Sequence, residues 1–118
     1  MPVKTRFKVL ASGTAVMEML SPSGMEEMVT LYSIDGDGIP LVHYCPTNNQ
    51  PRMVPDSDDI KELSFDDQGA GNLKSSSTDH QHRLVLRFNE ADHLTETWTW
   101  RQDDQDIPML FQLTRKKN

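Results

Sequence analysis

Residues 27–45 read EMVTLYSIDGDGIPLVHYC, and this stretch decides the fold class. Apolar, aromatic and β-branched residues fill both halves, as is typical of strands. The segment Asp35-Gly36-Asp37-Gly38 between the halves supplies the positive φ angles that a tight hairpin turn requires. The pattern therefore predicts a β-hairpin with one strand over 27–34 and a second strand over 39–45.

The same alternation continues in both directions along the chain. Runs rich in Val, Thr, Leu, Phe, Tyr and Trp are separated by Gly, Asp, Asn, Pro and Ser, and helical spacing persists nowhere. We expect loops over 46–51, 55–59, 66–79, 89–92 and 102–106, with 66–79 a surface loop rather than a lid. Further strands are predicted over 7–10, 14–20, 52–54, 60–65, 84–88, 94–100 and 107–113.

A chain of 118 residues has room for one domain, so a single domain is expected over 1–118. About eight short strands joined by hairpin-length loops indicate an all-β, antiparallel up-and-down sheet. Sheets of this size curl, and closure removes exposed edges that would pair with other chains. The sequence predicts a barrel or half-barrel, with a flatter sandwich as the alternative.

Composition excludes several functional classes. The chain has 12 Lys plus Arg against 18 Asp plus Glu, a net charge of −6, which disfavours nucleic acid as a partner. Cys45 is the sole cysteine, so an intrachain disulfide is excluded and a reducing cytoplasm is expected. The sequence shows neither a signal-peptide pattern nor a run of roughly 20 apolar residues, so membrane insertion is not expected.

Several segments carry a resemblance to a known group of proteins. They are GTAVMEML (13–20), the hairpin 27–45, NQPRM (49–53), HRLVLRF (82–88), DHLTETWTWR (92–101) and FQLTRK (111–116). In this order the chain resembles uncharacterised bacterial lipocalin-like, or calycin-type, proteins, and the most specific part is LVHYC followed by NQPRM. The resemblance implies a lipocalin-like barrel, similar in architecture to intracellular fatty-acid and haem-binding barrels.

The resemblance also bears on assembly. Members of the group carry an additional N-terminal strand ahead of the residues that match 6–10, and this chain lacks it. If that strand normally seals the barrel, an edge is left uncovered, and a second copy of the chain would cover it. The resemblance therefore implies a homodimer.

Two carboxylates are candidates for the barrel interior. Glu96 alternates with Trp98 on one face of its strand, and Glu18 shares the apolar face of the strand over 14–20. A buried carboxylate needs a cationic or hydrogen-bonding partner. The expected partners are Arg52 and His43.

Histidines share the inward faces of two strands. His43 alternates with Cys45, and His80 and His82 share a face with apolar neighbours. Such residues suit a metal site or an acid–base site, but a structural hydrogen-bond network is the favoured interpretation. We therefore expect no metal and no cofactor. For Cys45, an inert cysteine is favoured over a nucleophile.

Three functions remain open, and the sequence names no catalytic residue. The favoured hypothesis is a binding protein for a small apolar or amphipathic molecule. The alternatives are an enzyme with Glu96 or His43 as general acid or base, and a structural protein that only dimerises. The polar loop after Cys45 is expected to contact the ligand. The predicted ligand-binding residues are His43, Cys45, Asn49, Gln50, Arg52, His82, Glu96, Trp98 and Glu18.

Overall fold

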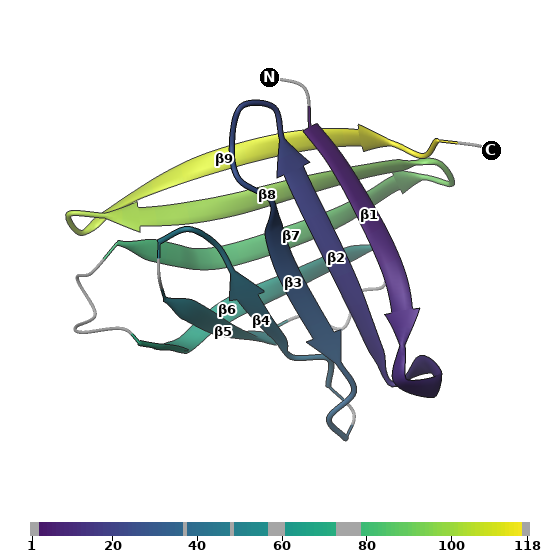
Figure 1. Ribbon diagram of the computed structural model, residues 1–118, viewed down its shortest axis with the longest axis horizontal. Coiled ribbons are helices and arrows are strands. Elements are labelled where there is room, and N and C mark those ends of the chain that lie inside the picture. The colour runs from purple at the N-terminus through teal and green to yellow at the C-terminus, as the bar shows by residue number, and fades with distance from the viewer. Residues whose placement is uncertain (1–2, 37, 48, 57–60, 73–78, 117–118) are drawn as a thin grey trace.

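The computed structural model describes residues 3–36, 38–47, 49–56, 61–72 and 79–116. They form one nine-stranded sheet in which every strand pairs antiparallel with the next (Figure 1). The prediction of an all-β, up-and-down architecture is confirmed, with nine strands against an expectation of about eight. The strands are β1 (Val3–Leu10), β2 (Ala15–Pro22), β3 (Met28–Ser33), β4 (Leu41–Tyr44), β5 (Gln50–Pro55), β6 (Glu62–Gly71), β7 (His80–Glu90), β8 (His93–Gln102) and β9 (Gln105–Thr114).

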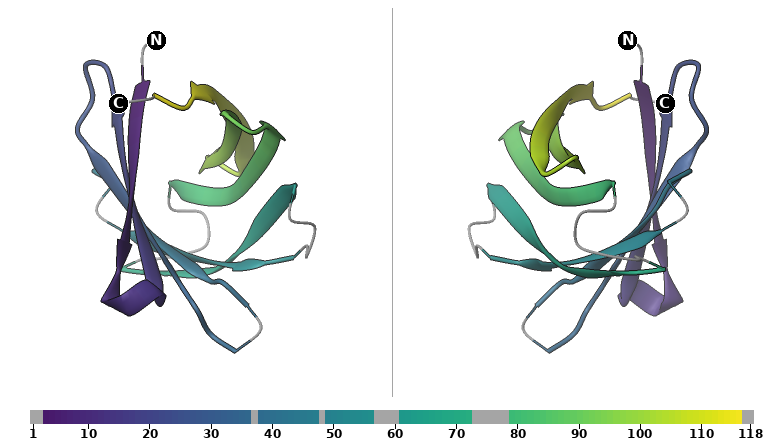
Figure 2. Two further views of the ribbon diagram at one scale, coloured as in Figure 1. Left: turned by 90° about the vertical axis from the view of Figure 1, so that its right-hand side faces the viewer. Right: turned by 90° about the vertical axis from the view of Figure 1, so that its left-hand side faces the viewer.

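The sheet curls into a nearly closed barrel (Figure 2). Each strand pairs with the next from β1 to β9. The two edge strands, β1 and β9, approach each other at the seam of the barrel, but among the described residues they are not hydrogen-bonded as neighbours in the sheet. A short 3₁₀ turn, η1 (Ala11–Gly13), connects β1 to β2. In the part of the chain that the structure describes, no helix has the length and apolar character to cross a bilayer.

The hairpin between β3 and β4 forms as predicted. The Asp35 amide donates to the Gly38 carbonyl at 2.9 Å, and the Gly38 amide donates to the Asp35 carbonyl at 3.0 Å. Gly36 takes a φ of +60°, a value that glycine adopts without steric cost. Asp37 lies outside the described residues. The strands are shorter than predicted, because pairing begins only at Leu41, beyond Pro40.

Two predicted loops are partly strand. β5 begins at Gln50, inside the expected loop 46–51, and β6 continues to Gly71, inside the expected loop 66–79. The ladder between these strands shifts register between Pro51 and Met53, and Gly69 takes a φ of +99° on β6. Pro and Gly argue against a strand in the sequence, but a β-bulge accommodates both. Residues 57–59 of the predicted turn, residue 60 of the predicted strand 60–65 and residues 73–78 of the predicted loop lie outside the described residues.

The last hairpin is tighter than predicted. β8 extends to Gln102, which pairs with Gln105, so the expected loop 102–106 reduces to Asp103 and Asp104. These two residues take φ angles of +51° and +60°. Two consecutive positive φ angles are the geometry of a two-residue hairpin turn, and aspartate tolerates them better than most residues.

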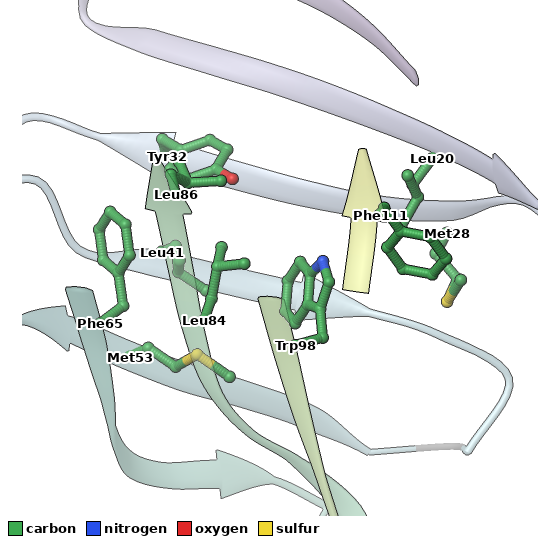
Figure 3. Close-up of a cluster of buried hydrophobic side chains, with 10 residues drawn as sticks. All are labelled: Leu20, Met28, Tyr32, Leu41, Met53, Phe65, Leu84, Leu86, Trp98 and Phe111. Carbon is green, nitrogen blue, oxygen red and sulfur yellow. The ribbon is translucent and has the colours of Figure 1, made fainter. Parts of the chain in front are cut away.

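The core lies inside the barrel and draws residues from β2 to β9 (Figure 3). Alternation along β7, β8 and β9 turns Leu84, Leu86, Trp98 and Phe111 inward, and all four are buried. Phe88 and Ile107 alternate with these residues on β7 and β9 but are exposed, and both lie near the ends of their strands. The buried apolar residues are Leu20, Met28, Tyr32, Leu41, Met53, Phe65, Leu84, Leu86, Trp98 and Phe111.

Candidate functional site

Two carboxylates are enclosed in the barrel, as the alternation of their strands predicts. Glu18 on β2 and Glu96 on β8 are both 0 % exposed. Each lies two residues from a buried apolar side chain, Leu20 and Trp98 respectively, so strand periodicity turns both carboxylates inward. Since burial of a carboxylate is costly, the contacts of these two groups decide what the interior can do.

Glu18 is held by two hydroxyl groups. The Tyr32 hydroxyl donates to Oε1 at 2.8 Å, and the Thr5 hydroxyl donates to Oε2 at 2.8 Å. The sequence-based expectation that Arg52 pairs with a buried carboxylate is wrong, because Arg52 is exposed on the outer face of β5 while its neighbours Pro51 and Met53 take the buried positions. Thr5 lies outside every strand predicted from the sequence.

Glu96 contacts both Trp98 and Glu18. The Trp98 indole Nε1 donates to Oε1 at 3.0 Å, and the side chain of Glu96 also forms a hydrogen bond with the side chain of Glu18. Burial, followed by the hydrogen bond with Glu18 and the charge of Glu18, raises the pKa of Glu96 from 4.5 to about 10. Glu96 is therefore protonated at neutral pH and can donate this hydrogen bond to the Glu18 carboxylate.

His43 contacts the same tryptophan. Its ring centroid lies 4.4 Å from that of Trp98, with the planes tilted by 41°. Nδ1 lies 2.8 Å from the Thr30 hydroxyl, and Nε2 is buried without a hydrogen-bond partner in the described part of the chain. Burial lowers the pKa of His43 from 6.5 to about 4, so the ring is neutral at physiological pH.

The protonation state of His43 can be measured directly. We expect the Cε1–H chemical shift of His43 to stay constant between pH 8 and about pH 5, because burial disfavours the imidazolium. Two-dimensional NMR of histidine-labelled protein checks this, with the resonance assigned through a His43→Gln variant. A midpoint at or above pH 6.5 would contradict the proposed environment of the ring.

We call Glu18, Tyr32, His43, Glu96 and Trp98 the interior site. Hydrogen bonds or ring contacts connect all five, because Glu18 contacts Tyr32 and Glu96, and Trp98 contacts Glu96 and His43. After burial as the larger cause, Glu18 raises the pKa of Tyr32 through its charge, and it raises the pKa of Glu96 through the hydrogen bond and its charge. Sequence reasoning missed Tyr32, although its alternation with buried Met28 and Thr30 on β3 could have identified it.

A second polar group, which we call the rim cluster, consists of Asp67, His80 and His82. His80 Nε2 lies 3.0 Å from His82 Nδ1, and His82 Nδ1 lies 3.7 Å from Asp67 Oδ2. Burial, followed by the charge of Arg101, lowers the pKa of His82. The sequence singled out His82 but missed Asp67, because 66–79 was predicted as a loop.

The other predicted site residues are dispersed. Asn49 is buried, and its side-chain amide donates to the Asp79 carbonyl at 2.9 Å, next to the rim cluster. Cys45 is partly buried, with Sγ 2.8 Å from the Thr47 hydroxyl. Gln50 pairs across the ladder with Gly71 and does not join the interior site.

The interior site offers a hydrogen-bonding group in a water-poor setting. The neutral imidazole of His43 either donates or accepts through Nε2, which has no partner among the described residues. The ring lies against the indole of Trp98, which supplies a wide apolar surface. Such an arrangement suits a molecule with one polar end.

No family model, no curated protein and no solved structure matches this chain.

Proposed function

We propose that this protein is a lipocalin-like barrel that binds a small amphipathic molecule and hydrogen-bonds its polar end at the interior site. The observation that supports the proposal is the buried His43 Nε2 atom, which has no hydrogen-bond partner among the described residues and belongs to the ring that packs against Trp98. Buried polar atoms in folded proteins are nearly always hydrogen-bonded, so this atom implies a missing partner. A hydroxyl, carbonyl or amine of a ligand would satisfy it.

The charges of the interior site select the kind of polar end. Glu18 accepts two hydrogen bonds from hydroxyl groups and raises the pKa of Glu96, which indicates a negative local potential. An anionic head group there would be repelled by the charge of Glu18, and the residues of the interior site include no cation to offset this repulsion. The preferred ligand therefore has a neutral or cationic polar end, in contrast to a fatty-acid carboxylate.

An apolar surface continues from the interior site along β1. Phe7 pairs with Glu18 and Val9 pairs with Val16, so Phe7 and Val9 lie on the inward face of the sheet. Nevertheless Phe7 is 46 % exposed and Val9 is 68 % exposed. An inward-facing apolar pair left open to solvent is suited to the apolar part of a ligand.

Matched fluorescent probes test the proposal. We expect the neutral probe N-phenyl-1-naphthylamine to bind with affinity at least about tenfold higher than its anionic analogue 8-anilinonaphthalene-1-sulfonate, a difference of about 1.4 kcal/mol. Phe7→Ser should weaken binding of the neutral probe by a similar factor, and Glu18→Gln, which removes the charge, should remove the preference between the probes. Fluorescence titration of the purified protein measures each value.

The control variant is Leu110→Ser, which changes another exposed apolar side chain, on β9, and should leave probe binding unchanged. Equal affinity for the two probes, or equal loss in the Phe7 and Leu110 variants, would contradict the proposed location. Native mass spectrometry of the protein as purified would then show whether any small molecule is retained.

The raised pKa of Glu96 and the lowered pKa of His43 favour one second candidate function. A carboxylic acid and a neutral imidazole beside one indole are a potential general acid and general base. In that case Glu96→Gln would abolish turnover of a bound substrate while retaining its binding. Retained turnover in this variant would exclude the role.

Other expectations from the sequence stay predictions. They are membership of the bacterial lipocalin-like group, a homodimer and a cytoplasmic location. The homodimer would compete with a ligand for the exposed apolar surface of Phe7 and Val9. Binding of the neutral probe should therefore shift a dimer toward monomer.

A further inference from the structure

We propose that the rim cluster binds one divalent transition-metal ion, with Asp67, His80 and His82 as its protein ligands. One ligand atom from each of the three residues lies within 4.8 Å of the others. The inference is independent of the proposed ligand in the barrel, because the rim cluster shares no residue with the interior site.

The distances fit a shared ion. Ring nitrogens that bind one metal at about 2.0–2.1 Å lie roughly 2.9 Å apart at a right angle and roughly 3.4 Å apart in a tetrahedron. The observed distance between His80 Nε2 and His82 Nδ1 is 3.0 Å. Asp67 Oδ2 lies 3.7 Å from His82 Nδ1, so a small rotation of its carboxylate completes the set.

A bulge on β7 and the end of the β6–β7 ladder place these residues together. Gln81 pairs with Trp100 and Arg83 pairs with Thr99, so His82 is the extra residue of a bulge on β7. Asp67 pairs with the buried Met53 and so shares its inward face. The β6–β7 ladder extends only to Asp66 and Arg83, and the cluster lies just beyond that last pair. Bulges of this kind frequently re-aim side chains at functional sites.

An unsatisfied atom gives independent support. Asp67 Oδ1 is buried and has no hydrogen-bond partner among the described residues. A carboxylate oxygen in this position normally finds a donor or a cation. The nearby cation Arg101 is engaged by Asp106, with Nε donating to Oδ1 at 2.8 Å and Nη2 donating to Oδ2 at 3.1 Å. A metal ion would satisfy Asp67 directly.

The donor set indicates the class of metal. Two imidazoles and one carboxylate suit Zn²⁺, Co²⁺ or Fe²⁺, whereas Ca²⁺ and Mg²⁺ prefer oxygen ligands alone. Three protein ligands leave at least one coordination position for water or another small ligand. The ion would therefore be accessible to exogenous ligands rather than fully enclosed by protein.

Cobalt titration of the metal-free protein tests the site. We expect one Co²⁺ per chain, visible d–d absorption, and displacement of that absorption by one equivalent of Zn²⁺ but not by Mg²⁺. Asp67→Asn should lower the affinity for Co²⁺ by about 10–100-fold, and His82→Ala should lower it by more than about 100-fold. His93→Ala, which removes an exposed histidine on β8, should change nothing.

Circular dichroism of each variant in EDTA establishes whether the variant is folded. If the His82→Ala variant is unfolded, the Co²⁺ affinity of Asp67→Asn decides whether the site exists. Absence of binding to the wild-type protein at micromolar Co²⁺ overturns the proposal. Unchanged affinity in Asp67→Asn, or an equal loss in His93→Ala, overturns it as well, because the ion would then lie elsewhere.

Discussion

Replacing Trp98 with alanine is expected to lower the free energy of unfolding by about 3–5 kcal/mol. The indole is buried, packs on the His43 ring and donates a hydrogen bond to Glu96. Its removal leaves a cavity and also removes the hydrogen bond that Oε1 of the buried Glu96 accepts from the indole. Urea denaturation at pH 7, followed by circular dichroism, measures the change.

The sequence supplies a matched control two residues away. Trp100 is only partly buried, and its indole donates to Gln102 instead of to a core group, so Trp100→Ala should cost about 1 kcal/mol. Trp98→Phe, which keeps an aromatic ring, provides a folded variant if the alanine variant does not fold. Equal destabilisation by Trp98→Ala and Trp100→Ala would show that the interior site does not depend on Trp98.

Replacing Glu96 with glutamine is expected to change how stability depends on pH. The pKa of Glu96 is 4.5 ordinarily and about 10 in the folded protein. Between these values the unfolded chain is ionised while the folded chain keeps the proton, so the wild-type protein loses stability as pH rises. The loss approaches about 1.4 kcal/mol per pH unit for a single proton. Glutamine does not titrate, so the variant lacks this loss.

The clearest window for this comparison is pH 7 to 9. Below pH 6.5, His43 acts in the opposite direction, because its lowered pKa removes stability as pH falls toward about 4. Tyr32 ionises in the unfolded chain only near pH 10 and does not affect the window. Glu90→Gln, at an exposed position, should retain the wild-type slope. Parallel stability profiles for wild type and Glu96→Gln would contradict burial of a protonated Glu96.

Much of the fold follows from local sequence signals. The hairpin 27–45 forms because its Gly-rich turn matches the twist of paired strands, and the inward positions of Glu18, Glu96 and Trp98 follow from alternation. These features depend only on residues that are close in the sequence. They can therefore be predicted from the sequence of each strand by itself.

Other features depend on pairing between distant strands. Asp67 occupies an inward position because β6 continues through a bulge at Gly69, and this pairing with β5 is not encoded in the local composition. Arg52 points outward because the register of β5 assigns the inward positions to its neighbours. Thr5 reaches Glu18 through pairing of β1 with β2. A one-residue change of register would reverse each assignment.

The most direct test of the interior site is the protonation state of Glu96 at neutral pH. Carbon NMR of protein labelled with ¹³C at the glutamate side-chain carboxyl should show one resonance at the chemical shift of a carboxylic acid at pH 7, and Glu96→Gln should remove it. If all glutamate resonances lie at carboxylate shifts at pH 7, the result contradicts a buried, protonated Glu96 and with it the proposed interior site.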